Sequence, residues 1–133
     1  MKIELDFSTW PSSDGNGYKA TEDGVVTLTT GSEENPQVYK ITGLPRALSR
    51  MTEYIVIGSE HITLDGNGKT VTVTANDYPG FVENGKMVDG TYDSTTGTYT
   101  QNNDIPAHGG CTIKNLSVDG TNGSLSENSE EEV

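Results

Sequence analysis

The chain has 133 residues, the length of a single domain, and its 20 Asp and Glu residues against 8 Lys and Arg give a formal net charge of −12. This charge repels a phosphate backbone and an anionic bilayer, so neither nucleic acid nor a membrane is an expected partner, whereas cations and neutral glycans are compatible with it. The single cysteine, Cys111, excludes an internal disulfide, and without a Cys/His cluster there is no zinc signature.

Hydrophobic residues make up only 31% of the chain, which also contains 16 glycines. This composition suits a thin, repetitive β structure in which each coil needs few inward aliphatic side chains. The N-terminal stretch KIELDFSTWPSS has neither the apolar region of a secretory signal nor the length to span a bilayer. We therefore expect synthesis in the cytoplasm and a final place in a virion or in an extracellular or surface assembly.

Short runs rich in β-branched residues alternate with turn-forming segments and predict strands. The segments between them include GSEENP, DGNGK and DGTNG, in which Gly and Asn permit positive φ and Pro ends a ladder. The segment LPRALSRM is compatible with either a short helix from Pro45 to Met51 or an irregular loop. The predicted strands cover residues 25–29, 38–41, 54–57, 61–64, 70–74 and 112–118.

An aliphatic-Asp-Gly triplet recurs in the sequence, beginning at Leu64, Val88 and Val118, with separations of 24 and 30 residues. Each separation is about one coil of a β-solenoid. In such a coil the aliphatic residue points inward at the end of a strand, Asp accepts hydrogen bonds from the turn backbone, and Gly takes the left-handed conformation. The repeat therefore favours stacked coils.

Two segments resemble the pectate-lyase-like right-handed β-helix proteins: YIVIGSEHITLDGNGKTVTVT, residues 54–74, and CTIKNLSVDGTNG, residues 111–123. The first is similar to the family's early coil. The second is similar to its recurring coil, with Asn115 where the family stacks asparagines. The resemblance implies an architecture but no activity, because the same coils occur in lyases, hydrolases, phage tailspikes, adhesins and capsid-associated proteins.

We therefore predict an all-β fold, a right-handed single-stranded parallel β-helix (solenoid) of about three coils with an N-terminal cap. Residues 1–53 would form the cap and first strands, residues 54–125 the β-helix coils with a protruding loop or hairpin at 77–110, and residues 126–133 an acidic tail. The core positions predicted from alternation and from the repeat are Ile62, Leu64, Ile113, Leu116 and Val118.

Three coils are few for an isolated solenoid, so we expect either a truncated chain or support from another chain. The C-terminal end is the one that needs cover. After Cys111 the coil presents apolar core residues and unpaired backbone groups, and Leu125 is the only later aliphatic residue before the acidic tail. We therefore expect association, with copies of the same chain or with other proteins, through the region after Cys111.

The candidates for a metal site are Asp65, Asp89 and Asp119, with calcium as the candidate ion, because aspartates stacked in register could share a cation. Each precedes a glycine in a predicted turn, however, where Asp already has a structural role. His61 and His108 have no identifiable partner for acid–base chemistry. No residue is assigned a catalytic role, and no cofactor is expected.

The leading functional hypothesis is a non-catalytic structural or interaction module that assembles with itself or with other proteins, as a component of a virus or phage particle such as a capsid, tail or spike. One alternative is the N-terminal part of a polysaccharide lyase or glycoside hydrolase. Another is a carbohydrate-binding adhesin, in which Trp10, Tyr92 and Tyr99 would stack on sugar rings.

Overall fold

The computed structural model of the chain describes residues 2–75, 80–84, 90–93, 95, 98–101 and 108–120. Within these residues every regular element is a β-strand, and no helix that could cross a membrane is found among them. The strands are β1 Lys2–Asp6, β2 Tyr18–Ala20, β3 Val25–Leu28, β4 Gln37–Gly43, β5 Tyr54–Ile57, β6 Ile62–Val73, β7 Val82–Glu83, β8 Gly90–Asp93, β9 Thr98–Gln101 and β10 Thr112–Gly120.

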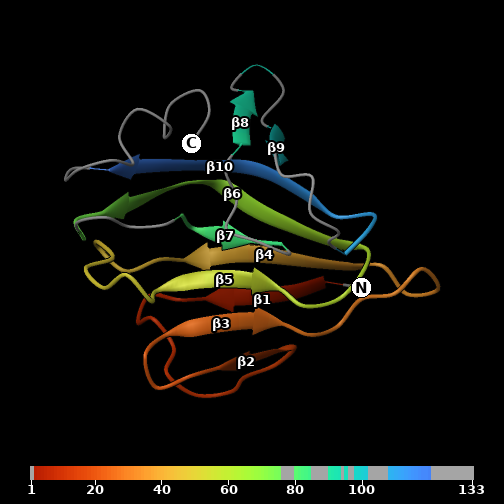
Figure 1. The fold of residues 1–133 in the computed structure, drawn as a ribbon, viewed down its shortest axis with the longest axis horizontal. Coiled ribbons are helices and arrows are strands. Elements are labelled where there is room, and N and C mark those ends of the chain that lie inside the picture. The colour runs from red at the N-terminus through yellow and green to blue at the C-terminus, as the bar shows by residue number, and fades with distance from the viewer. Residues whose placement is uncertain are drawn as a thin grey trace.

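The strands form two sheets (Figure 1). One sheet has the order β1-β4-β6-β10-β9-β8, and the other has the order β2-β3-β5-β7. From β1 to β7 the chain passes back and forth between the sheets, so the arrows of β4, β6 and β10 point the opposite way to those of β3 and β5 in Figure 1. Neighbours in the series β1-β4-β6-β10 and β3-β5-β7 are parallel, because each return crosses through the other sheet.

The prediction of a right-handed single-stranded parallel β-helix is wrong. Both sheets contain antiparallel pairs: β2 with β3 in one, and β8 with β9 and β9 with β10 in the other. The steps between parallel neighbours are also uneven, because a much longer segment separates β6 from β10 than separates β4 from β6. The physical reason is that hairpins enter both sheets, and a hairpin needs a tight antiparallel turn where a solenoid coil needs a crossover.

The Asp-Gly repeat that supported the solenoid does not set the strand register. In the six-stranded sheet Leu64 pairs with Ile113, and Val118 pairs with Val71. The first and last triplets are therefore offset along the strands and do not stack on one another. The middle triplet, which begins at Val88, includes residues outside the described part of the chain. The Asp-Gly pairs of both described triplets, Asp65-Gly66 and Asp119-Gly120, lie within strands and not in turns between coils.

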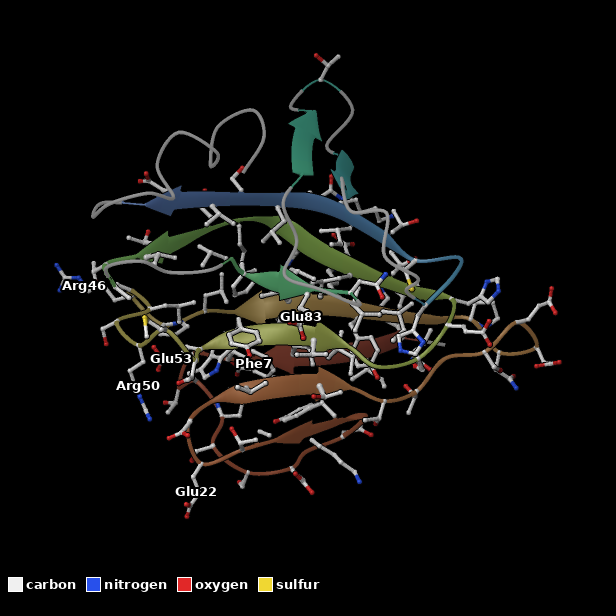
Figure 2. The ribbon with its side chains drawn as sticks, viewed as in Figure 1. Phe7, Glu22, Arg46, Arg50, Glu53 and Glu83 are labelled. Atoms are coloured by element: carbon white, nitrogen blue, oxygen red, sulfur yellow. The ribbon has the colours of Figure 1, made fainter. Side chains whose placement is uncertain are left out.

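The core lies between the two sheets and is built by residues that alternate along each strand. In β4, for example, Gln37, Tyr39 and Ile41 are buried and their neighbours are not. Such alternation is expected of strands with one face on a core. The five predicted core residues are all at most 4% exposed, namely Ile62, Leu64, Ile113, Leu116 and Val118. Figure 2 shows Phe7 between the strands, while Glu22 and Arg46 project outward.

Both β6 and β10 bend in the middle, and the bend changes which residues point inward. Asn67 (φ 57°) and Asn115 (φ 56°) adopt the left-handed conformation there, which Asn tolerates better than most residues. In β10 the buried positions consequently shift from Ile113 to Leu116 and Val118, three and then two residues apart. The sequence indicated a turn at DGNGK, whereas the structure keeps that segment inside one strand, β6.

Residues 45–51 form an irregular loop, not a helix. Leu48 is pulled into a parallel bridge with Val73, in which its N–H donates to the Thr72 carbonyl and its carbonyl accepts from the Thr74 N–H, both at 2.8 Å. Leu48 is 1% exposed, so the loop extends the sheet and contributes to the core.

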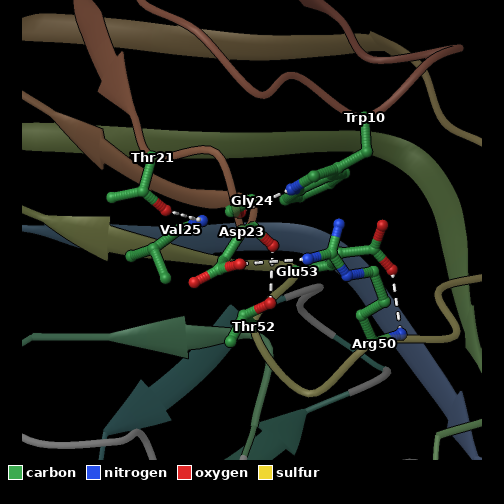
Figure 3. Close-up of polar contacts among 8 residues, drawn as sticks. All are labelled: Trp10, Thr21, Asp23, Gly24, Val25, Arg50, Thr52 and Glu53. Carbon is green, nitrogen blue, oxygen red and sulfur yellow. Dashed lines mark hydrogen bonds and ion pairs between the residues drawn. The ribbon is translucent and has the colours of Figure 1, made fainter.

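Polar side chains tie the loops together near the N-terminal end (Figure 3). The Trp10 indole N–H donates to the Gly24 carbonyl at 2.6 Å, and the Thr52 hydroxyl donates to the Asp23 carbonyl at 2.5 Å. An exposed ion pair joins Arg50 to the Asp23 carboxylate at 3.2 Å. These contacts connect the β2–β3 turn with the segments before β2 and before β5.

A second polar contact at this end is buried. The Tyr39 side chain is fully buried in β4, and its hydroxyl donates to the Gly17 carbonyl at 2.5 Å. The same oxygen accepts the Thr30 N–H at 3.2 Å and lies 2.7 Å from the Thr30 hydroxyl. One phenol therefore fixes the segments on both sides of the β2–β3 hairpin to the six-stranded sheet.

Candidate functional site

The start of β10 is anchored by a buried asparagine. Asn84 is 4% exposed, and its side chain forms two hydrogen bonds with the backbone of His108: its Nδ2 donates to the carbonyl at 3.2 Å, and its Oδ1 accepts the N–H at 3.0 Å. The His61 N–H then donates to the Gly109 carbonyl at 2.8 Å. The chain that leaves after β7 is thus brought back to the sheet at a defined point, and β10 begins there.

Cys111 lies half-buried beside this anchor, 3.7 Å from the Ser59 carbonyl oxygen and 3.6 Å from that of Gly109. Burial raises the pKa of the Cys111 thiol, and nearby Glu60 adds to this, outweighing the backbone N–H groups that lower it. A thiol with a raised pKa stays protonated at neutral pH and is a poor nucleophile. Cys111 is partly buried and packs against the core.

The first half of β10 has a strand on each side. Thr112, Ile113 and Lys114 pair with β6, and on the opposite side Ile113 pairs with Tyr99 and Lys114 with Thr98 of β9. β9 runs antiparallel to β10, and β8 pairs antiparallel with β9 on its other side. The β8–β9 hairpin therefore occupies this part of the sheet edge. Figure 1 shows β8 and β9 standing over the middle of β10.

The second half of β10 has a strand on one side only. Leu116–Gly120 pairs with Lys69–Val73 of β6, and no other strand in the described chain pairs with it. In Figure 1 none of the labelled strands lies beyond the arrowhead half of β10. We call residues 116–120 the open edge. Along it Leu116 and Val118 are buried, Ser117 is half-buried and Asp119 is exposed.

The open edge begins directly after the bend at Asn115, and Asp65 stabilises this bend. Its Oδ1 accepts the Asn67 N–H at 2.8 Å and the Asn115 side-chain N–H at 3.2 Å. Burial raises the pKa of Asp65. The two hydrogen bonds, together with Lys114 and Lys40 on the neighbouring strands, lower the pKa by more than burial raises it, so it lies below the usual value of 3.8. The carboxylate is therefore ionised and structural at neutral pH.

The predicted metal candidates do not come together. Asp65 pairs with Lys114 and Asp119 pairs with Thr72, so these two aspartates lie on different parts of β6 and β10, and Asp89 lies outside the described residues. Within the described ranges no three His, Cys, Asp or Glu side chains are grouped so that they could hold a metal ion.

The aromatic residues suggested for glycan stacking have different surroundings. Trp10 contacts the core, with its ring centroid 5.0 Å from that of Phe7 and 5.9 Å from that of Phe81. Its N–H is already bonded to the Gly24 carbonyl, so Trp10 is a structural residue of the N-terminal end. Tyr92 and Tyr99 are opposite one another in the β8–β9 hairpin.

The open edge was only partly foreseen from sequence. The lack of a strand-like run after Val118 pointed to an uncovered end. The expected uncovered core is not found, because Leu116 and Val118 are at most 3% exposed in the single chain. Among the described strands, what has no cover is the backbone edge on one half of β10. No local pattern around Tyr99 shows that its strand would cover the other half, because that pairing is a tertiary contact.

Comparison of the chain with protein-family models, with curated proteins and with solved structures found no match.

Proposed function

We propose that the protein is a non-catalytic interaction module that joins a larger protein assembly by accepting a strand at the open edge. The observation that carries the proposal is the one-sided pairing of Leu116–Gly120 with β6. Unpaired N–H and C=O groups on a strand edge form main-chain hydrogen bonds with an incoming strand, a recurring mode of protein recognition. The bend held by Asp65 presents this edge already in strand conformation.

The other outer strands of the two sheets are poorer acceptors. The exposed residues of β1 are Lys2, Glu4 and Asp6, all charged, and charges on an edge discourage strand addition. In the four-stranded sheet β2 has three residues and β7 has two, and β8, the outer strand of the six-stranded sheet beyond β9, has four, so none of them offers a ladder as long as the open edge. The open edge has five residues and a single charge, Asp119. It is therefore the favourable edge among the described strands.

The chemistry of the described ionisable groups supports a non-catalytic role. Asp65 is held by hydrogen bonds that maintain the bend, Asp23 is paired with Arg50, and the Cys111 thiol is kept protonated. Each of these groups has a structural partner or an unreactive state, whereas general acids, bases and nucleophiles need a perturbed group directed at a substrate site.

The test compares two lysine substitutions in the full chain, expressed in its native source and analysed by sedimentation of the extract. Ser117→Lys places a charge on the open edge. Thr63→Lys places the same charge on an outward position of β6, which has β4 and β10 on its two sides. We expect the parent and Thr63→Lys to sediment as an assembly larger than the 14.2 kDa chain, and Ser117→Lys to sediment as a single chain.

The role of the open edge would be overturned if both variants sedimented like the parent. The three purified proteins should have the same melting temperature, which shows that they fold alike. The non-catalytic part has its own test. Incubation of the purified protein with polygalacturonate should release no unsaturated product. Appearance of ultraviolet-absorbing product in an amount that scales with protein concentration would overturn it.

A further inference from the structure

The open edge has a residue pattern that matches itself in the antiparallel direction. If two copies of β10 are laid antiparallel about Ser117, Leu116 of one copy lies opposite Val118 of the other, and Asn115 lies opposite Asp119. Residues opposite one another in such a pair share a face. The two buried aliphatic positions therefore meet on the inner side, and an amide meets a carboxylate on the outer side.

We propose that the partner at the open edge is a second copy of this chain, joined to the first as an antiparallel β10–β10 pair with its twofold axis at Ser117. This inference rests on the proposed function, because it identifies the strand that the open edge accepts. A pair of this kind is isologous and closes on itself, so it gives a dimer and not a fibre.

The β8–β9 hairpin limits the registers that are available. It occupies the edge at Ile113 and Lys114, so pairing must stay C-terminal to Lys114. A register centred on Leu116 would require Lys114 to pair with Val118 on the edge that β9 already covers. A register centred on Val118 would set Leu116 opposite Gly120, which has no side chain to contact it. The register centred on Ser117 pairs residues 115–119 and leaves only Gly120 opposite Lys114, so both aliphatic residues of the open edge keep a partner.

The alternative of head-to-tail stacking, with β10 of one copy beside β1 of the next, is disfavoured by charge. In a parallel arrangement that keeps the buried residues on one face, Leu116 would align with Ile3 and Asp119 with Asp6. Moving β10 by two residues toward the start of β1 aligns Asp119 with Glu4 instead, and moving it the other way carries Val118 and Asp119 past Asp6, where β1 ends. Like charges directly opposite one another destabilise a strand pair. The antiparallel pair sets Asp119 against Asn115, whose side-chain nitrogen has a second N–H besides the one given to Asp65.

A strand pair of five residues buries little surface, so the dimer should be weak and concentration-dependent. Disulfide trapping suits a weak complex because it accumulates the associated form. Only a residue on the twofold axis lies directly opposite its own copy. Copies of residue 119 would be displaced by four residues along the strands, about 13 Å, which is far beyond the reach of a disulfide.

The experiment uses the full chain with Cys111→Ala, which removes the native thiol, and adds either Ser117→Cys or Asp119→Cys. Under mild oxidation we expect a disulfide-linked dimer from Ser117→Cys and monomer from Asp119→Cys and from Cys111→Ala alone. Sedimentation of the parent at rising concentration should approach twice the mass of one chain, and Ser117→Lys should remain monomeric because two like charges would meet on the axis.

Three results would overturn the inference. If Asp119→Cys were trapped and Ser117→Cys were not, the register would be wrong. If the purified parent stayed monomeric and Ser117→Cys were not trapped, while Ser117→Lys still released the chain from its native assembly, the partner would be a different protein and the proposed function would stand. If Ser117→Lys changed neither the sedimentation of the purified protein nor that of its native assembly, both the inference and the proposed function would fail.

Discussion

The two ends of the paired sheets are closed by different means. At the N-terminal end side chains close the structure: Trp10, Tyr39 and Thr52 each donate to a backbone carbonyl of a distant segment. At the C-terminal end β10 is held mainly by strand pairing, with β6 along its length and with β9 on its first half, while the side chains of Asn84 and Asp65 fix only its start and its bend. Side-chain contacts thus close one end within the chain, whereas at the other end no described strand pairs with the second side of Leu116–Gly120.

The largest effect is expected from a charge in the core at the C-terminal end. Leu116→Asp should abolish cooperative folding, because an unpaired buried carboxylate costs several kcal/mol. Thermal unfolding followed by circular dichroism measures this. Thr112→Asp, an exposed position of the same strand, is the matched control and should melt like the parent. A cooperative Leu116→Asp transition at the parental temperature would show that β10 is not part of the shared core.

A smaller loss is expected at the N-terminal end from Tyr39→Phe. The ring remains, but the Gly17 carbonyl loses one of its donors and the partly buried Thr30 N–H loses its acceptor, so the free energy of unfolding should fall by about 1–3 kcal/mol. Urea titration gives the value. Tyr54→Phe removes a hydroxyl that forms no hydrogen bond within the described chain, and should change stability much less. Equal effects of the two would argue against the buried phenol as the closure of this end.

The pH dependence of the bend gives a third comparison. The pKa of Asp65 is lower in the folded protein than its usual value, so the folded state binds fewer protons. Its stabilising contribution is therefore present above pH 3.8 and is lost as the pH falls through the lowered folded value. Asp65→Asn should flatten the dependence of the urea midpoint on pH in that acidic range and leave the neutral range with a small loss. A variant with the parental acid dependence would mean that Asp65 does not hold the bend.

The smallest effect is expected from the exposed ion pair at the N-terminal end. Arg50 and Asp23 have side chains that are 53% and 71% exposed, so Arg50→Ala should lower stability by about 0.5 kcal/mol or less. Thr52→Val, which removes the neighbouring hydroxyl bond to the Asp23 carbonyl, is the informative comparison and should cost more. The urea midpoint of Thr52→Val should therefore lie below that of Arg50→Ala. The reverse order would mean that the ion pair, and not the Thr52 hydroxyl, is the main link between these segments.

Local patterns predicted the central strands well because β-branched runs between Gly, Asn and Pro residues identify strands without tertiary information. Residues 25–28, 54–57 and the 112–118 part of β10 were foreseen in this way. Residues 1–53 were predicted to form a cap and first strands, and no strand was predicted at residues 2–6, although Ile3 and Leu5 are buried in β1. Its partner is β4, across a long stretch of sequence, and a local pattern carries no information on such a pairing.

The candidate site was predicted less well than the strands. The buried positions Leu116 and Val118 followed from alternation, but their burial was expected to need a second chain, and the single chain buries them. The separation of β10 into a covered and an uncovered half depends on where the β8–β9 hairpin folds back. That position is set by the Asn84 contact with His108, which joins residues 24 apart in sequence.

The contact of Asn84 with His108 also matters for protein engineering, because it joins the two ends of the segment between them. Because Asn84 and His108 are joined at the base, the segment between them begins and ends at one place, whatever its length. Closing a longer loop costs only about 0.6 kcal/mol of chain entropy for each doubling of length. The structure thus contains a natural exchange point, where a foreign hairpin could replace β8 and β9 while the other strands of the two sheets keep their pairing.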